Sequence, residues 1–244
     1  MTKKIILDKN ILIGASLDAE LEEGHSIRDG FYEESSELID TIEEREDVEG
    51  GVFEEEIKDL RNLLSTIIMG KPEHRYDCEG AHRQCYEHLE ENLESLNVVS
   101  VKEDEYGEFL EPVDELYEGL KEKFDDVLLD MYGVESSIEK YGSEKDIIEE
   151  LSEDKDMSNY RRLYRKLIKE PAEDEDRELM AKTMYLESLT DEEVYFASTD
   201  YHFSEIRYGD EEPEDYFVPE AIEEELGVVC EWPDRLCERY LAAS

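Results

Sequence analysis

Two short apolar runs in the chain are uninterrupted by polar residues, and each stops at a polar or acidic position. Residues 5–7 (Ile-Ile-Leu) end at Asp8, and residues 194–197 (Val-Tyr-Phe-Ala) end just before the segment that carries Asp200. A continuous apolar run, unlike an alternating one, is typical of a strand that is covered on both faces, as in a parallel sheet. We therefore predict buried strands at these two places, and further short strands at 52–53, 98–101 and 227–230.

Apolar residues spaced three and four apart predict helices between these strands. The clearest stripe lies in residues 54–69, where Ile57, Leu60 and Leu64 fall on one face. The Gly50-Gly51 pair is expected to break the preceding helical pattern before the strand at 52–53. The predicted helices cover 31–46, 54–69, 79–96, 112–131, 143–151, 158–169, 172–189 and 219–226.

The order of these elements predicts an α/β fold. A strand, helix, strand, helix beginning, followed by helices and then strand, helix, strand, favours a three-layer α/β/α sandwich around a mostly parallel central sheet. We expect residues 1–69 and 157–244 to form the two parts of this sheet domain, with a mainly helical insertion at 70–156.

The charge of the chain changes the expected surface and solvent. The sequence contains 71 Asp and Glu residues against 26 Lys and Arg, for a formal net charge of −45. The acids are interleaved with apolar residues along the whole chain, which favours a folded protein with an acidic surface over a disordered acidic tail or a nucleic-acid mimic. Because molar salt reduces the screening length to about 3 Å, we expect a halophilic protein from an organism with a salty cytoplasm.

The location of the protein is predicted from what the sequence does not contain. No stretch approaches the length of a membrane span, and the beginning of the chain lacks the apolar length and cleavage site of a signal peptide. The four cysteines do not resemble a secreted disulfide framework in a chain of 244 residues. We expect a cytoplasmic protein with free thiols and no membrane partner.

Four acidic side chains form the strongest candidate for chemistry. Asp8 and Asp200 directly follow predicted strands, and ligands of open parallel sheets bind beyond the carboxyl ends of the strands. Glu56 and Asp176 occupy positions where the apolar stripes of their helices would otherwise continue, and a buried acid is costly unless something compensates it. The alternative for each Asp after a strand is an ordinary loop residue. For Asp176 it is a first-turn acid that the helix dipole stabilises.

Together these carboxylates predict a site for a hard divalent cation. Mg²⁺ and Mn²⁺ prefer oxygen ligands and commonly retain water and phosphate oxygens. A bound ion offsets the mutual repulsion of the acids, lowers the pKa of a water and neutralises charge that develops on a phosphate. The sequence offers no phosphate-binding glycine loop, nucleophile elbow or HExxH pair as an alternative.

In four segments the sequence resembles the PIN-domain family. These are I-I-L-D-K-N-I-L at 5–12, V-F-E-E-E-I at 52–57, D-R-E-L-M-A at 176–181 and V-Y-F-A-S-T-D-Y-H-F at 194–203. The chain departs from the family at His202, where a further acid is common, and in its long middle segment, which the resemblance leaves unassigned.

The resemblance implies a metal-dependent endoribonuclease that hydrolyses RNA with Mg²⁺ or Mn²⁺. Many small family members are toxins held by an antitoxin protein, and others act in RNA maturation or decay, so an antitoxin and a homodimer are partners to test. The acids that match the family pattern are Asp8, Glu56, Asp176 and Asp200, and the small polar residues that support the site in many members match Asn10 and Thr199.

One basic segment is a candidate RNA contact. In residues 160–169, Arg161, Arg165 and Lys169 repeat every four positions and share one face of a predicted helix. This ridge could hold an RNA backbone, with nearby tyrosines stacking on bases. A helix that exchanges salt bridges with its acidic surroundings explains the same pattern.

A zinc site is weighed for a second cluster, which contains Cys78, His82, Cys85 and His88. Their spacings of four, three and three place them on one side of a predicted helix. A straight helix presents two adjacent ligands to one ion, but not four in a tetrahedron. An ordinary helical face is therefore favoured, and zinc would require a break near Gly80 or a partner chain.

Three classes of function follow from the sequence. The leading one is the metal-dependent ribonuclease. The alternatives are a non-catalytic PIN-like module that binds RNA or protein in a regulatory role, and an acidic mimic without catalytic activity. Metal binding that vanishes when Asp8 is replaced separates the first from the second, and a cooperative thermal transition at high salt excludes the third.

Overall fold

The computed structural model describes residues 2–18, 29–70, 78–132, 172–204 and 217–242. The chain divides into two compact units. Unit 1 comprises Met1–Tyr106 and Lys182–Ser244, and unit 2 comprises Gly107–Ala181. Among the described residues, no helix combines the length and apolar character that crossing a membrane requires.

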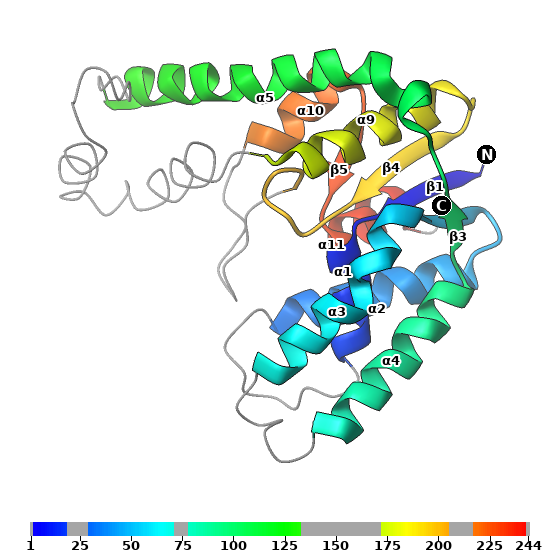
Figure 1. Ribbon diagram of the computed structural model, residues 1–244. Helices are drawn as coiled ribbons and strands as arrows, with labels where there is room; N and C mark the ends of the chain where they lie inside the picture. The colour runs from blue at the N-terminus through cyan, green and yellow to red at the C-terminus, as the bar shows by residue number, and fades with distance from the viewer. Residues whose placement is uncertain (1, 19–28, 71–77, 133–171, 205–216, 243–244) are drawn as a thin grey trace. The chain divides into compact units, whose positions relative to one another are not determined.

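Unit 1 is built on a five-stranded sheet in which each strand runs parallel to its neighbours (Figure 1). The strand order is β3-β2-β1-β4-β5, so the order reverses between β1 and β4. The predicted α/β class and parallel sheet are confirmed. The strands are β1 (Lys3–Leu7), β2 (Val48–Phe53), β3 (Asn97–Val99), β4 (Glu193–Ala197) and β5 (Val229–Glu231).

Helices connect and flank these strands, an arrangement compatible with a three-layer sandwich (Figure 1). Two long helices, α5 (Glu103–Tyr132) and α9 (Asp174–Ser188), run across the boundary between the units. The helices that lie wholly in unit 1 are α1 (Lys9–Asp18), α2 (Asp29–Glu44), α3 (Glu54–Gly70), α4 (Cys78–Glu94), α10 (Phe217–Leu226), α11 (Pro233–Leu236) and the π-helix η4 (Cys237–Leu241).

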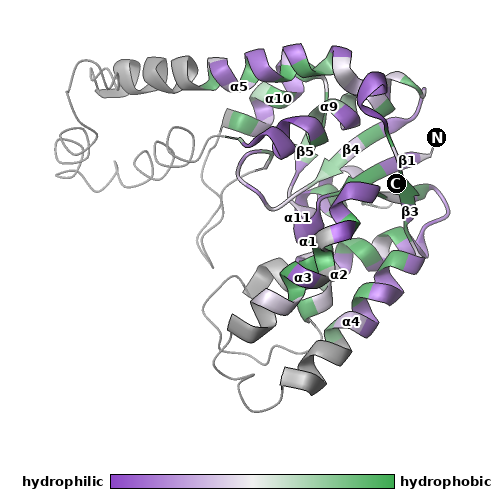
Figure 2. Ribbon diagram, viewed as in Figure 1, coloured by the Kyte–Doolittle hydropathy of each residue, from purple (hydrophilic) through white to green (hydrophobic). Residues whose placement is uncertain are grey.

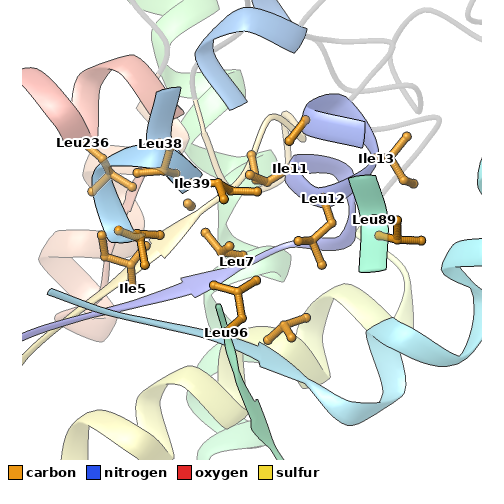
Figure 3. Close-up of a cluster of buried hydrophobic side chains, with 14 of the residues drawn as sticks. Ile5, Leu7, Ile11, Leu12, Ile13, Leu38, Ile39, Leu89, Leu96 and Leu236 are labelled. Carbon is orange, nitrogen blue, oxygen red and sulfur yellow. The ribbon is translucent and has the colours of Figure 1, made fainter. Parts of the chain in front are cut away.

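The main core lies between one face of the sheet and helices α1, α2, α3 and α4. Ile5 and Leu7 of β1 point into this cluster, as Figure 3 shows, and both are fully buried. Ile6, between them, points to the opposite face and is equally buried. Figure 2 shows hydrophobic colours along much of β4 and a mixture of hydrophilic and hydrophobic colours along the coloured part of α4. Burial of β1 on both faces explains why its sequence is a continuous apolar run.

Helix α1 was not predicted from the sequence. All residues from Ile11 to Leu17 are buried, since the helix packs against α2, α3 and α4 as well as the sheet. A helix that is apolar all round has no amphipathic period to detect. The C-terminal helices α11 and η4 were missed as well, because each spans only four or five residues.

The preceding helix ends at Glu44, before Gly50-Gly51, but the strand that follows is longer than the predicted 52–53, and both glycines lie inside β2. A Cβ on Gly50 would come within 2.4 Å of Leu96 Cδ2 and 2.8 Å of Ile42 Cγ2. The glycine is therefore required by the close approach of these two side chains to the strand, and not by a turn.

The middle of the chain, for which an insertion at 70–156 was predicted, contributes to both units. Helix α4 and strand β3 belong to unit 1, with β3 as an edge strand of the sheet. Helix α5 begins at Glu103, earlier than expected, and includes Pro112. In unit 2 an ion pair of 2.8 Å joins Arg177 to Asp114. The predicted helices at 143–151 and 158–169 lie outside the described residues.

Candidate active site at the carboxyl edge of the sheet

The candidate site lies where the strand order reverses, beyond the carboxyl ends of β1 and β4. The last paired residues of these strands are Leu7 and Ala197. The backbone N–H of Asp8 then donates to the carbonyl of Ala197 at 3.0 Å, which keeps the two chain segments together past the strands. Crevices at such switch points are the usual binding sites of parallel α/β sheets.

Asp8 is held at the start of α1 by three donors. Ser198 Oγ donates to Oδ2 at 2.5 Å, Asn10 Nδ2 donates to the same oxygen at 3.2 Å, and the backbone N–H of Asn10 donates to Oδ1 at 3.3 Å. The last of these bonds is a helix N-cap interaction, which satisfies an N–H group of the first turn. These bonds hold the carboxyl group of Asp8 in place, and because the residue is only 2% exposed, the group is nearly excluded from solvent.

Glu56 lies in the first turn of α3 and is the second buried acid. It is 6% exposed, which confirms the expectation that it lies on the buried side of its helix, whereas the side chain of Glu55 is 44% exposed. Lys9 contacts Glu56 twice. Its backbone N–H donates to Oε2 at 3.3 Å, and its Nζ lies 3.7 Å from Oε1. Asp8 and Glu56 are therefore linked through a single residue of the chain.

A second lysine fixes the beginning of α3. Lys182 is 4% exposed, and its Nζ lies 3.7 Å from Glu55 Oε1. The ammonium group also lies over the rings of Phe53 and Tyr106, at 5.9 and 5.1 Å from their centroids. Ring faces attract a cation at these distances. Lys182 thereby ties the junction of β2 and α3, on which the position of Glu56 depends.

Of the three candidate acids that lie in unit 1, Asp200 is the most accessible, with a side chain 29% exposed. Its Oδ1 accepts the backbone N–H of His202 at 2.9 Å and lies 3.0 Å from His202 Nδ1. The backbone N–H of Asp200 donates to Ser198 Oγ at 3.0 Å. Since Ser198 also bonds Asp8, one hydroxyl group connects the ends of β1 and β4.

The three carboxyl groups interact electrostatically. The pKa of Asp8 is raised to about 7, first because burial disfavours its charged form, and then because of the charges of Glu56 and Asp200. The bonds from Ser198 and Asn10 act in the opposite direction but are outweighed. A cation placed among these groups would reverse this balance.

Two contacts at the site were not anticipated from the sequence. The residues involved are Lys9 and Ser198; their positions beside the predicted acids were the only available signal. Sequence comparison with the PIN pattern selected Thr199, which is buried, but the hydroxyl group that contacts Asp8 comes from the preceding residue. The supporting role of Thr199 stays a prediction.

Asp176 belongs to unit 2 and has a local structural role. It is the third residue of α9, and its Oδ2 accepts the backbone N–H of Glu173 at 2.9 Å. An acid at this position satisfies an N–H group that the helix leaves open and interacts favourably with the helix dipole. This agrees with the alternative interpretation of Asp176 as a first-turn acid that the helix dipole stabilises. The membership of Asp176 in the metal site stays a prediction.

The other two predicted sites are the cysteine and histidine cluster and the basic ridge, and the structure describes only part of the first. Cys85 is 1% exposed and belongs to the main core, whereas the side chain of His88 is 44% exposed and lies 3.7 Å from Glu91. Cys85 and His88 therefore occupy different environments. The side chains of Cys78 and His82, and the whole of the basic ridge Arg161, Arg165 and Lys169, lie outside the described part of the chain.

Comparisons of the chain with protein-family models, with curated proteins and with solved structures found no match. The assignment of a function therefore depends on the geometry. In the described part of the chain, no three His, Cys, Asp or Glu side chains are already arranged as a ligand set for a metal. The donor chemistry nevertheless suits a hard cation, since Asp8, Glu56 and Asp200 supply carboxylate oxygens to one edge of the sheet.

Proposed function

We propose that the protein is a metal-dependent phosphodiesterase that hydrolyses RNA at the carboxyl edge of its sheet. The observation that carries the proposal is the gathering of Asp8, Glu56 and Asp200 beyond the ends of the strands, where Asp8 is buried and its pKa is raised by burial and by the charges of the other two acids. Such perturbed carboxyl groups are concentrated at functional sites. RNA as the substrate rests on the resemblance of these same segments to PIN domains.

The residues present fit Mg²⁺ or Mn²⁺. Asp8, Glu56 and Asp200 of unit 1 would hold the ion, and the part of Asp176 in metal binding stays a prediction. When bound, the ion would activate a water and offset charge on the phosphate. Ser198 and Asn10 fix the carboxyl group of Asp8 in one orientation, and the backbone N–H of His202 does the same for Asp200. Such supporting bonds preorganise ligands before the ion arrives.

The test is cleavage of a fluorescently labelled single-stranded RNA by the full chain in molar KCl, with and without Mn²⁺. We expect Asp8→Asn and Asp200→Asn each to reduce cleavage by about 100-fold, the upper range for groups that support a metal site. Glu54→Gln is the matched control, because Glu54 is an exposed acid in the same turn as Glu56. Wild-type cleavage by Asp8→Asn would contradict the proposal.

A calorimetric titration with Mn²⁺ separates metal binding from catalysis. In the wild type we expect a saturable binding event that Asp8→Asn weakens and Glu54→Gln leaves unchanged. Binding of Mn²⁺ without any cleavage of RNA would favour the non-catalytic module over the enzyme.

A further inference from the structure

Lys9 carries a positive charge into the candidate site, and its contacts there are specific. It is the first residue of α1 and directly follows Asp8. Its backbone N–H and its ammonium group both face Glu56, at 3.3 and 3.7 Å from the two carboxylate oxygens. Its side chain is 30% exposed, whereas that of Glu56 is 7% exposed. The lysine thus spans from a buried acid to the solvent side of the site.

We propose that Lys9 is an exchangeable counter-ion, which neutralises Glu56 and would bind a phosphate oxygen of the RNA when Glu56 holds a divalent ion. This inference rests on the proposed function, and it deepens that function by assigning a substrate-binding group that the sequence comparison did not supply.

The first half of the exchange follows from the burial of Glu56. A buried charge needs a compensating partner, and removing one member of a buried pair leaves the other uncompensated. Lys9 fills this role, with its Nζ 3.7 Å from Glu56 Oε1. A divalent ion carries twice the charge and binds carboxylate oxygens directly, so at Glu56 it would compete with the ammonium group for the same oxygen.

The second half follows from the chemistry of the lysine side chain. An ammonium group is a compact charge on a flexible stem, so it can change partners while its backbone stays fixed. The backbone of Lys9 is fixed, since its N–H donates to Glu56 and it follows the anchored Asp8. An ammonium group released beside a metal-bound phosphodiester is well placed to bind a non-bridging oxygen.

The charge of the whole protein makes such a local cation important. With a net charge of −45, the surface repels a polyanionic substrate at long range. Molar salt screens this repulsion and also weakens ordinary contacts with the RNA backbone. A short-range cation inside the site would keep its effect, because it acts within a few ångströms of the phosphate.

The experiment uses Lys9→Met, which keeps the stem and removes the charge, and Lys9→Arg, which keeps the charge. Two affinities are measured in molar KCl: Mn²⁺ by calorimetry without RNA, and a labelled single-stranded RNA by fluorescence anisotropy with Ca²⁺ in place of Mn²⁺. We expect Lys9→Met to bind Mn²⁺ several-fold more tightly, because its competitor is gone, and to bind RNA about 10-fold more weakly. Lys9→Arg should bind both as the wild type does.

Lys58→Met is the control for the loss of one positive charge, since Lys58 is exposed on the same helix as Glu56. It should change neither affinity. Thermal melting without metal should show Lys9→Met to be less stable than the wild type, and the double variant with Glu56→Gln should recover this loss. That recovery distinguishes an uncompensated Glu56 from general misfolding.

The opposing outcomes are distinct. Mn²⁺ binding that is unchanged or weaker in Lys9→Met overturns the exchange, and tighter Mn²⁺ binding with unchanged RNA affinity overturns the role in substrate binding. If the wild type binds Mn²⁺ and RNA but cleaves nothing, the proposed catalytic function fails while both affinity tests of Lys9 remain decisive.

Discussion

Charged side chains are paired differently at the two ends of the strands in the parallel sheet. The amino ends of the strands form the amino edge, and their carboxyl ends form the carboxyl edge. At the amino edge, Arg45 forms two hydrogen bonds with Asp47, at 2.9 and 2.7 Å, and also donates to the carbonyl of Leu241 near the end of the chain. Lys3, at the start of β1, donates to the carbonyl of Tyr240. The pKa of Asp47 is lowered, chiefly by its hydrogen bonds with Arg45. Charges here are matched, and the pair lies at the surface.

At the carboxyl edge, acids are gathered with less compensation. Asp8 is buried, and the charges of Glu56 and Asp200 add to the burial in raising its pKa to about 7. A raised pKa of an acid means that folding favours the protonated form. The contribution of Asp8 to stability is therefore fully present below its ordinary pKa of 3.8, and is lost as the pH rises through about 7.

The difference supports the proposal that the amino edge serves the fold and the carboxyl edge binds a ligand. The amino edge joins the end of the chain to the sheet with contacts that need nothing further. At the carboxyl edge the burial of Asp8 beside two further acids has an electrostatic cost, and a divalent cation would offset it. The comparison can be tested by neutralising one charge at each edge.

The largest effect is expected for Asp8→Asn in the absence of metal. The variant removes the charge whose burial is unfavourable, so at about pH 8 it should be more stable than the wild type by up to about 4 kcal/mol, the free energy equivalent of the pKa shift. The gain should shrink as the pH falls towards 5, since Asp8 is then protonated in the folded wild type. Denaturant unfolding at several pH values measures it.

Asp40→Asn is the control, because Asp40 is an exposed acid of α2 and its loss changes the net charge by the same amount. A similar gain in both variants would mean that relief of overall repulsion, and not the site, is responsible. Addition of Mn²⁺ should stabilise the wild type and leave Asp8→Asn almost unaffected, which would reverse their order.

The sequence predicted best those elements that are buried on both faces, such as the central strands, or on one face only, such as an amphipathic helix. Strands β1 and β4 were predicted from continuous apolar runs, and the burial of Glu56 was predicted from the leucines on its helical face. These predictions depend on local periodicity alone. The convergence of Asp8 and Asp200 at one edge of the sheet was expected from the way parallel strands align, and the pairing of β1 with β4 brings their carboxyl ends together.

The sequence was least informative where tertiary packing overrides local pattern. Helix α1 has no polar face, and the glycines of β2 reflect side chains contributed by Ile42 and Leu96. The pairing of Lys9 with Glu56 joins residues 47 positions apart and has no signature in either segment. Contacts of this kind depend on the strand order, which the sequence pattern left open.

A smaller effect is expected when the amino edge is changed. Arg45→Met removes the pair with Asp47 and the bond to Leu241, so the midpoint of thermal unfolding should fall by a few degrees. The loss should be equal at about pH 5.5 and pH 8, because Asp47, with its lowered pKa, is ionised throughout that range. Thermal melting followed by circular dichroism tests this. A loss that varies with pH as strongly as the gain in Asp8→Asn would remove the contrast between the edges.

The smallest effect is the response to salt of the stability gain in Asp8→Asn and of the stability loss in Arg45→Met. It tests whether burial causes the contrast between the two edges. The screening length falls from about 10 Å at 0.1 M to about 3 Å at 1 M salt, and buried charges are screened much less than exposed ones. Raising KCl from about 0.5 M to about 3 M should therefore reduce the loss in Arg45→Met, since Asp47 is exposed, with 54% of its side chain accessible. The gain in Asp8→Asn at about pH 8 should stay nearly constant, because Asp8 is 2% exposed.

The wild type and Lys58→Met, measured in the same series, account for the general stabilisation of an acidic protein by salt. If the Asp8→Asn gain decayed with salt as quickly as the Arg45→Met loss, the cost at the carboxyl edge would come from surface repulsion, and the case for a buried, ligand-dependent site would be lost.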